Sequence, residues 1–348
     1  MRAAVYHGPL DLRVEDVAEP NVKPGTVKVA VAFNGICGTD LHEYYEGPQF
    51  IPESPHPRTG FAMPVVMGHE FSGTVTEVGA DVEHLAVGDR VAIEPLRTCG
   101  SCYACTSGAY NACSTVTVVG IAGGQGGLAE FVVVPADKAH PLPDAVDLES
   151  GALVEPMAVA YHAVKLADPQ PGQSALVFGA GPIGLGAALS LRALGVDDVT
   201  AVEIAPARRK VLDQLGIASI NPVADDLQAY VDSHTGGRGV DLAVDCAGHS
   251  VTFQPAINAV RPHGTVVLVA MSPQPVAFVP STLNLTEITI RGSHTYTAQD
   301  YRDVIELMAQ GAYPVNPSWV THATLAQIVT DGFESLHNGQ AMKVLIDI

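Results

Sequence analysis

Four closely spaced cysteines carry the strongest chemical signal in the sequence. Cys99, Cys102, Cys105 and Cys113 form the pattern C-x2-C-x2-C-x7-C within RTCGSCYACTSGAYNAC. Thiolates at this spacing suit tetrahedral zinc coordination, and the small residues between them offer little material for a hydrophobic core. Because four cysteines would fill every position around the ion, we expect a structural zinc. An iron–sulfur cluster is the alternative, whereas disulfides are disfavoured in a reducing compartment.

A glycine turn is the second pattern. Gly179, Gly181 and Gly184 read G-x-G-x-x-G, with Pro182 and Ile183 between them, directly after the apolar run SALVF. Bare backbone in such a turn lets a pyrophosphate approach the N–H groups at the start of the following helix. The pattern therefore predicts a dinucleotide site. The alternative is the same turn in an α/β domain that binds no nucleotide.

An acidic side chain stands where the next strand of such a domain should end. Glu203 follows Gly184 by nineteen residues and would accept hydrogen bonds from the adenosine ribose hydroxyls. Its charge would repel a 2′-phosphate, which favours NAD over NADP. Arg208 and Arg209 are close in sequence and could attract that phosphate. We give the carboxylate more weight, because it should contact the hydroxyls directly.

The elements that must position these residues suggest two domains, which suits a chain of 348 residues. Up to residue 155, short apolar runs such as Val27–Phe33, Phe71–Val78 and Arg90–Pro95 are typical of a β-rich domain. In the tail, 296–348, we expect an amphipathic helix at 300–310 and a strand at 343–348 that returns to the sheet of the first domain.

Between residues 156 and 295 the pattern changes to strands that alternate with helices. We expect strands at 175–178, 199–204, 240–245, 265–270 and 288–291, and helices at 183–194, at 207–215 and in a segment that ends near residue 261. Such alternation predicts βαβ units in a parallel, doubly wound sheet, so the expected fold class is α/β.

Cys37, His69, Glu70 and Glu155 are further candidates for chemistry, but none is persuasive alone. A buried cysteine is usually a small apolar residue, and a single histidine usually has a structural or surface role. We interpret Cys246 in this way, as a packed thiol. A carboxylate such as Glu70 would be costly in a core without a partner.

Taken together, the motifs show a resemblance. Gly68-His69-Glu70, the four-cysteine pattern and the glycine turn, in this order, resemble the zinc-dependent medium-chain dehydrogenase/reductase family over essentially the whole chain. The segment GPQFIPESPHPRTGFAMPVVMGHEFSG is similar to the 2,3-butanediol (acetoin) dehydrogenase branch, with sorbitol dehydrogenases next. The resemblance implies a GroES-like catalytic domain at 1–155 with 296–348, and a Rossmann NAD-binding domain at 156–295.

The resemblance also implies a catalytic zinc besides the structural one. Cys37 and His69 match its ligands, and Glu155 matches the position where alcohol dehydrogenases carry a second cysteine. One thiolate, one carboxylate and a neutral imidazole balance the charge of Zn²⁺, and oxygen makes the metal a harder Lewis acid than sulfur does. Glu70 is expected either as a ligand itself or as a close neighbour that acts on the ligands.

Three further residues match functional positions of the family. Thr39 and His42 match a proton relay that runs from the substrate hydroxyl through Thr39 and a cofactor ribose hydroxyl to His42. Lys343 matches a basic position that neutralises the cofactor pyrophosphate. Read alone, Thr39 could cap a helix, His42 could be an exposed histidine, and Lys343 could be an exposed lysine before an edge strand.

The reaction implied by the resemblance is hydride transfer between NAD(H) and a secondary alcohol, such as a vicinal diol and its hydroxyketone. Sorbitol or threonine oxidation is an alternative within the same enzyme class. A zinc-bearing, nucleotide-binding scaffold without activity is an alternative of another class. The segment 47–64 contains five prolines and is expected to form a stiff wall or lid near the substrate.

Composition narrows the possible partners. Hydrophobic residues make up 47% of the chain, enough for large cores, and 37 acidic against 18 basic residues give a net charge of −19. Such a balance disfavours nucleic acids, which reward a basic face. No apolar stretch suits a membrane span or the core of a secretory signal, so we expect a cytoplasmic protein with a small-molecule alcohol or ketone substrate. Family members commonly form homodimers or homotetramers.

Overall fold

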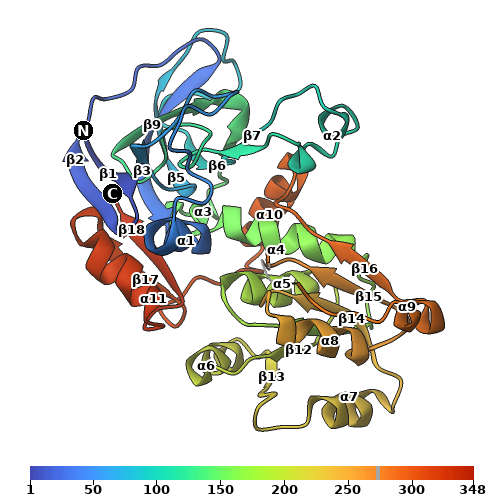
Figure 1. Cartoon of the computed structure of the whole chain (residues 1–348). Coiled ribbons are helices and arrows are strands. Elements are labelled where there is room, and N and C mark those ends of the chain that lie inside the picture. Colours follow the sequence, from blue (N-terminus) through green and yellow to red (C-terminus); the bar gives the residue numbers. More distant parts are fainter. Residues whose placement is uncertain (272–274) are drawn as a thin grey trace. The chain divides into compact units, whose positions relative to one another are not determined.

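The computed structural model describes residues 1–271 and 275–348, which form two compact units. The first unit comprises Met1–Glu155, Thr297–Gln310 and Pro314–Ile348, and the second comprises Pro156–Tyr296 and Gly311–Tyr313. The first unit therefore contains both ends of the chain, drawn in blue and red in Figure 1.

Antiparallel and mixed sheets build the first unit. The largest has the order β10-β6-β5-β3-β18-β17, and β9 also pairs with β3. Its strands are β3 (Thr26–Gly35), β5 (Glu70–Val78), β6 (Arg90–Ile93), β9 (Phe131–Pro135), β10 (Ala139–Pro141), β17 (Val320–Thr324) and β18 (Lys343–Asp347). A second sheet joins β2 (Asp11–Asp16), β1 (Arg2–Gly8) and β4 (Val65–Val66), and a ribbon joins β7 (Leu96–Arg97) to β8 (Thr117–Val118).

Short helices connect these strands. They are α1 (Gly38–Glu46), α2 (Tyr103–Thr106), α3 (Leu148–Gly151), α10 (Ala298–Ala309) and α11 (Glu334–His337), with a π-helical stretch at Ile328–Phe333 and a 3₁₀ turn at Tyr110–Ala112. The predicted helix in the tail corresponds to α10. Its capping box joins Thr297 and Asp300, because each side chain binds the backbone N–H of the other residue.

The core of the first unit lies against the long strands β3 and β5. Val27, Val29 and Val31 of β3 pack with Phe71 and Val75 of β5 in one buried cluster. Alternate residues of a strand point to the same face, so this spacing places the three valines of β3 on one side of the sheet. The predicted β-rich character of the first domain is confirmed.

The last strand completes this sheet. β18 is antiparallel to β3 and parallel to β17, so it lies inside the sheet. Leu345 and Ile346 are fully buried. The predicted return of the chain is confirmed, whereas the alternative of an edge strand is wrong, because β17 covers the other side of β18.

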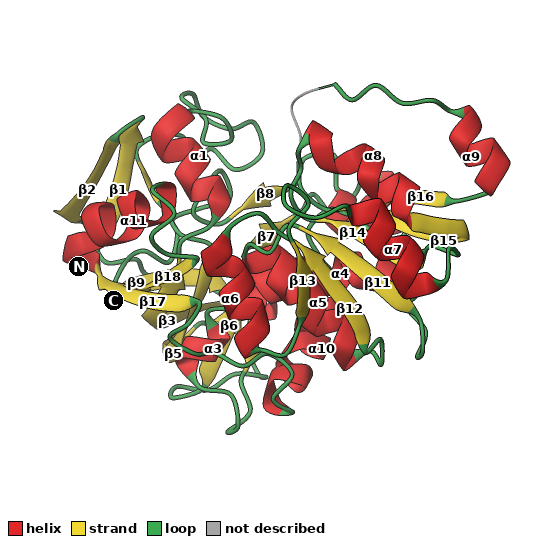
Figure 2. Ribbon diagram, turned by 90° about the horizontal axis from the view of Figure 1, so that it is seen from below, coloured by secondary structure: helices red, strands yellow, loops and turns green. Residues whose placement is uncertain are grey.

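A six-stranded parallel sheet forms the second unit, in the order β13-β12-β11-β14-β15-β16. The strands are β11 (Ser174–Phe178), β12 (Asp198–Val202), β13 (Ala218–Ile220), β14 (Val240–Asp245), β15 (Val260–Leu268) and β16 (Thr289–Gly292). The helices are α5 (Pro182–Ala193), α6 (Pro206–Gln214), α7 (Leu227–Thr235), α8 (Ser250–Ala259), α9 (Ser281–Thr286) and α4 (Val154–Leu166), whose first two residues belong to the first unit. Figure 2 shows helices on both faces of this sheet, which confirms the predicted doubly wound α/β class.

Four elements of the second unit were not predicted, namely α4, β13, α7 and α9. In β13, Ala218 and Ser219 are exposed, and in α7 only Val231 is buried. Neither segment therefore shows the apolar periodicity from which elements can be predicted. None of the helices in the described residues has the length and apolar character that a membrane crossing requires.

We expect His322 to stabilise the first unit in a pH-dependent way. Its Nδ1 lies 2.7 Å from Asp347 of β18, and its Nε2 lies 3.0 Å from Glu149 of α3. Partial burial lowers the pKa of His322, but the two carboxylates raise it by more. The stability that protonated His322 contributes is therefore fully present below the pKa of histidine in the unfolded chain, about 6.5. This stability is lost as the pH rises through the higher pKa of His322 in the folded protein.

Urea denaturation of the variant His322→Gln tests this expectation. At about pH 5.5 the variant should lose less than about 1 kcal/mol of its free energy of unfolding, because the ring is partly exposed. At about pH 9 the loss should be smaller. Asp347→Asn should weaken the same pH dependence, and the double variant should add little to the larger single effect. An equal loss at both pH values would contradict the assignment.

Candidate functional site

Cys37, His69 and Glu70 form a cluster of possible metal ligands in the first unit. One donor atom from each lies within 4.8 Å of the others. The strand pairing explains why, because Gly35 at the end of β3 lies opposite Glu70 at the start of β5. Cys37 follows β3 by two residues and His69 precedes β5 by one. The structure therefore brings together three of the four residues expected at the catalytic zinc.

Asp40 supports this cluster and was not identified from the sequence. Its carboxylate is fully buried, accepts the N–H of Cys37 at 2.9 Å and lies 3.5 Å from Nδ1 of His69. Burial lowers the pKa of His69, but Asp40 and Cys37 raise it well above its ordinary value. A positive charge is thus favoured here, as a site for a cation requires. The sequence feature from which Asp40 could have been identified is its position, as an acidic residue three positions after Cys37.

Glu70 is paired with Lys343. The ammonium group contacts the Glu70 carboxylate and donates to the carbonyl of Ile36 at 2.9 Å. Lys343 is only 2% exposed, so the alternative of an exposed lysine is wrong. Gly35 makes room for the pair, because a Cβ atom there would lie 2.3 Å from a Glu70 oxygen. The expected role of Lys343 at a pyrophosphate stays a prediction.

Glu155 is buried in the first turn of α4. It does not belong to the group of donor atoms within 4.8 Å that the described residues form around Cys37. Burial raises the pKa of Tyr301 well above its usual range, and the charges of Glu155, Glu94 and Glu70 add to this effect. Glu155 and Glu70 therefore both lie close enough to act on one buried tyrosine.

Thr39 and His42 lie on α1, which begins directly after Cys37. Cys37 is the N-cap residue, so the alternative of Thr39 as the helix cap is wrong. The Thr39 hydroxyl lies 3.8 Å from the Cys37 sulfur. The His42 side chain is 60% exposed and stands about one turn further along the helix. The helix therefore connects the buried cluster with solvent, and the relay stays a prediction.

The four cysteines of the loop between β7 and β8 converge, as zinc coordination requires. Their sulfur atoms all lie within 4.8 Å of one another, with 3.5 Å between Cys113 and Cys99. All six cysteines of the chain are free thiols. Hydrogen bonds from Ser101 and Cys102 lower the pKa of Cys99 to about 5, which favours the thiolate that a metal binds. We call the segment 98–116 the cysteine lobe.

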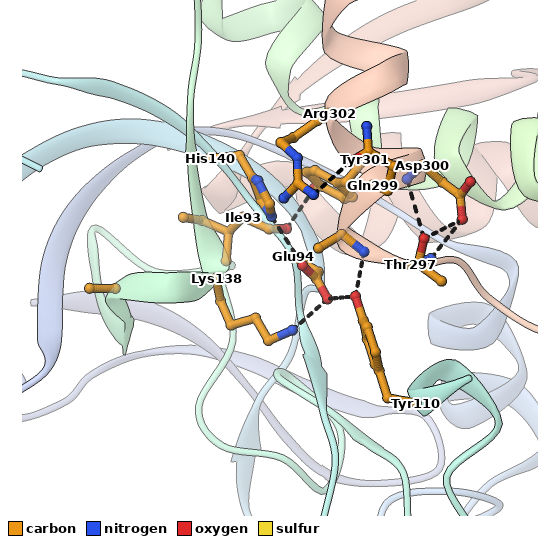
Figure 3. Close-up of polar contacts among 12 residues, drawn as sticks. Ile93, Glu94, Tyr110, Lys138, His140, Thr297, Gln299, Asp300, Tyr301 and Arg302 are labelled. Atoms are coloured by element: carbon orange, nitrogen blue, oxygen red, sulfur yellow. Dashed lines mark hydrogen bonds and ion pairs between the residues drawn. The ribbon is translucent and has the colours of Figure 1, made fainter. Parts of the chain in front are cut away.

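A buried carboxylate, Glu94, fixes the far end of the cysteine lobe (Figure 3). Its Oε1 accepts the Tyr110 hydroxyl at 3.2 Å and the Lys138 ammonium at 2.5 Å, and its Oε2 lies 3.0 Å from His140. Burial raises the pKa of Glu94, but His140 and Lys138 lower it by more. The Tyr110 hydroxyl in turn accepts the N–H of Ala298, so the lobe is tied to the start of α10.

The glycine turn of the second unit fits an anionic group. A Cβ atom at Gly184 would lie 1.9 Å from the carbonyl oxygen of Gly179, so only glycine allows this close packing. Gly181 is the N-cap of α5, has no side-chain cap, and faces open space. The first N–H groups of α5 are thus available to an anion.

Glu203 lies beside this turn, in the wall of a cavity of about 770 Å³ within the second unit. Its carboxylate accepts the N–H of Ala180 at 2.7 Å and of Ala205 at 2.8 Å. Arg208 approaches it to 3.6 Å. Cys246 also lines the cavity, and burial, with the charge of Asp245, raises the pKa of its thiol. The cavity thus combines an anion-binding helix start with a fixed carboxylate.

Known proteins with similar sequences include butanediol dehydrogenases and proteins named as probable D-xylulose reductases. The chain is 39% identical to (R,R)-butanediol dehydrogenase of Bacillus subtilis, and the match covers 99% of each chain. It is 36% identical to (R,R)-butanediol dehydrogenase of Neisseria gonorrhoeae, over 100% of this chain and 99% of the relative. It is 34% identical to a D-xylulose reductase A of Arthroderma otae, over 98% and 96%.

Solved structures and family models agree with these matches. The crystal structure of the B. subtilis 2R,3R-butanediol dehydrogenase superposes with a TM-score of 0.94, over 100% of this chain and 99% of that chain at 39% identity. A zinc-binding dehydrogenase of Sinorhizobium meliloti 1021 with NADP bound reaches 0.88 over 100% and 99%, at 28% identity. Residues 23–144 match the alcohol dehydrogenase GroES-like domain, and residues 182–310 match the zinc-binding dehydrogenase domain. The chain therefore belongs to the zinc-dependent medium-chain dehydrogenase/reductase family, and it is an oxidoreductase of the alcohol dehydrogenase type.

Proposed function

We propose that this protein is a zinc-dependent dehydrogenase that uses NAD to interconvert a vicinal diol, such as 2,3-butanediol, and its hydroxyketone, such as acetoin. The observation that carries the proposal is the cluster of Cys37, His69 and Glu70 with Asp40 behind the histidine. The diol is proposed because the B. subtilis and N. gonorrhoeae relatives, similar over nearly their whole length, are butanediol dehydrogenases.

The donor atoms fit two zinc ions of different character. The four cysteines would hold a structural zinc, because they leave no open position. Cys37 and His69 would hold the catalytic zinc, with Glu155 as the third ligand and Glu70 as the neighbour that Lys343 keeps paired. Bound zinc would supply the Lewis acidity that acidifies the substrate hydroxyl, and the nicotinamide would accept the hydride.

The chain's own residues would then orient the groups and move the proton. Asp40 holds His69 in place and fixes the N–H of Cys37, so the two ligands keep their geometry. We expect the hydroxyl of Thr39, which lies close to the Cys37 sulfur, to accept the substrate proton. His42 is exposed on the same helix, so its imidazole suits release of the proton to solvent.

NAD is proposed as the cofactor because Glu203 is buried beside the glycine turn. Its carboxylate, fixed by two backbone N–H groups, would accept the ribose hydroxyls and repel a 2′-phosphate. Lys343 remains a candidate for neutralising the pyrophosphate. Two observations favour NADP instead: Arg208 lies close to Glu203, and the related S. meliloti structure contains NADP. We also propose a cytoplasmic homodimer or homotetramer, from the family resemblance.

A polyol such as xylitol or sorbitol is the second candidate substrate. The D-xylulose reductase relative favours it, at 34% identity. The two candidates differ in chain length and in the number of hydroxyl groups, and both react at a secondary alcohol. A rate screen of the purified protein over 2,3-butanediol, sorbitol, xylitol, threonine and simple secondary alcohols separates them. Absence of turnover with every alcohol, in zinc-loaded protein, would favour the scaffold alternative.

Asp40→Asn should weaken the catalytic metal site. The variant keeps the shape of the side chain but removes the charge that faces His69, so zinc affinity should fall by about 10- to 100-fold. Dialysis against a graded series of chelator concentrations measures this affinity without an activity assay. Asp137→Asn, which removes an exposed carboxylate of the same unit, is the matched control. Equal zinc retention in both variants would disprove the role of Asp40.

Metal analysis should find about two zinc atoms per chain, one for each cluster. Glu155→Ala should lower turnover and zinc content together, because a carboxylate ligand is lost. Cys102→Ser should chiefly lower the unfolding temperature, since a structural site contributes folding free energy. If the wild-type protein contains one zinc per chain and is fully active, one of the two proposed zinc sites does not exist.

Glu203→Ala should change the choice of cofactor. Loss of the carboxylate removes hydrogen bonds to the ribose and repulsion of the 2′-phosphate, so kcat/KM for NADP relative to NAD should rise by about 10- to 100-fold. Asp225→Ala removes another acidic side chain of the same cavity and serves as the control. Comparable kcat/KM with NAD and NADP in the wild type would show that Arg208 and Arg209 attract the 2′-phosphate as strongly as Glu203 repels it.

A further inference from the structure

The proline-rich segment 47–64 is fastened at its beginning by a buried carboxylate. Glu43 of α1 is fully buried and accepts the N–H of Gln49 at 3.1 Å and of Ile51 at 3.2 Å, as well as that of Phe50. Ile51 packs in the same buried cluster as Ile36, next to Cys37. The start of the segment is therefore held by the helix that follows the cluster of Cys37, His69 and Glu70.

The second half of the segment is fastened to the cysteine lobe by Arg58. Its guanidinium donates to the carbonyls of Arg97 at 2.8 Å, Thr115 at 2.9 Å and Thr98 at 3.3 Å, and to the Thr117 hydroxyl at 2.7 Å. All four acceptors are neutral, so charge-assisted hydrogen bonds hold the side chain without an ion pair among them.

These acceptors lie where the chain enters and leaves the cysteine lobe. Arg97 and Thr98 directly precede Cys99, and Thr115 and Thr117 follow Cys113. They face one guanidinium only because β7 and β8 pair, with Arg97 opposite Thr117. Such a short two-stranded ribbon is marginal by itself. The burial of Leu96 anchors it on the core side, and whatever closes the lobe constrains it on the other side.

Besides the contacts of Arg58, the described residues show two features that constrain the lobe, the Tyr110 contact and the convergence of the four thiols. The Tyr110 hydroxyl is bound by Glu94, as described above. Apart from this contact, the lobe has little apolar packing, because the helix α2 contains no buried residue and Tyr103 is 87% exposed. The convergence of four thiols is therefore the main constraint on the geometry of the ribbon.

We propose that Arg58 is a positioning residue that couples the cysteine lobe to the segment 47–64. Metal in the lobe orders the ribbon β7-β8, the ribbon presents four acceptors to Arg58, and Arg58 fixes the segment that Glu43 ties to α1. If the segment 47–64 forms the expected wall near the substrate, the lobe would thereby shape the substrate side of the active site. This consequence for the substrate rests on the proposed function, whereas the coupling itself does not.

Hydrogen–deuterium exchange of the full-length, zinc-loaded protein tests the coupling. The reporters are the amides of Gly60 and Met63, which donate within the segment to His56 and Pro52. In Arg58→Met, and equally in Cys102→Ser, both amides should exchange about tenfold faster, because the second half of the segment opens more often. The amide of Ile51, held by Glu43, should keep its protection in both variants.

Matched variants distinguish the role of Arg58 from a general loss of order. Arg13→Met removes another guanidinium of the first unit, one that binds the exposed strand residue Asp11, and should leave every reporter unchanged. Arg58→Lys keeps the charge but loses the forked N–H donors of the guanidinium. Exchange at the reporter amides should therefore be faster than in the wild type and slower than in Arg58→Met. If Cys102→Ser does not fold, Tyr110→Phe loosens the lobe by another contact and should also speed exchange at Gly60.

Kinetics adds the functional side of the test. In Arg58→Met, KM for the diol should rise by about three- to tenfold, with kcat and KM for NAD nearly unchanged, since only the substrate wall is altered. Unchanged exchange at Gly60 and Met63 in Arg58→Met would overturn the proposal, as would a loosened lobe with a normal segment in Cys102→Ser. Altered exchange without any diol turnover would instead refute the proposed function and leave the coupling intact.

Discussion

The pairing of β3 with β5 is the constraint on which the candidate active site depends. Their register places Gly35 opposite Glu70, so residues separated by more than thirty positions in the chain reach one point. A shift of one residue would turn every side chain of the shifted strand to the opposite face and carry Glu70 away from Lys343. The buried valines on β3 and the aromatic Phe71 on β5 hold this register, because a slip would expose them to water.

Charges buried around this pairing are compensated one by one. Glu70 has Lys343, Asp40 faces His69, and Glu94 has Lys138 and His140. Removing one member of such a set leaves an uncompensated charge, which costs far more than the pair contributes. The first unit is thus stiff where ligands must be held in position, and its sheet provides the frame for that stiffness.

The sequence predicted the α/β class and most elements of the parallel sheet, because buried strands such as β11 and β14 are rich in apolar residues. It also singled out Cys37, His69 and Glu70, although spacing alone could not bring them together. Asp40, Gly35 and Arg58 were missed for a physical reason. Gly35 and Arg58 act through partners that are distant in sequence, and Asp40 acts through a turn geometry that no periodicity reveals. Which carboxylate binds the catalytic metal also depends on tertiary contacts.

The position of β18 has a consequence for how the chain is made. This strand supplies Lys343 and is synthesised long after β3, beside which it lies. Until β18 has been made, β3 lacks one neighbour and Glu70 lacks its cation. The second unit, which is nearly continuous in sequence, can mature earlier. Loss of β18 would therefore damage a part of the first unit that is synthesised much earlier.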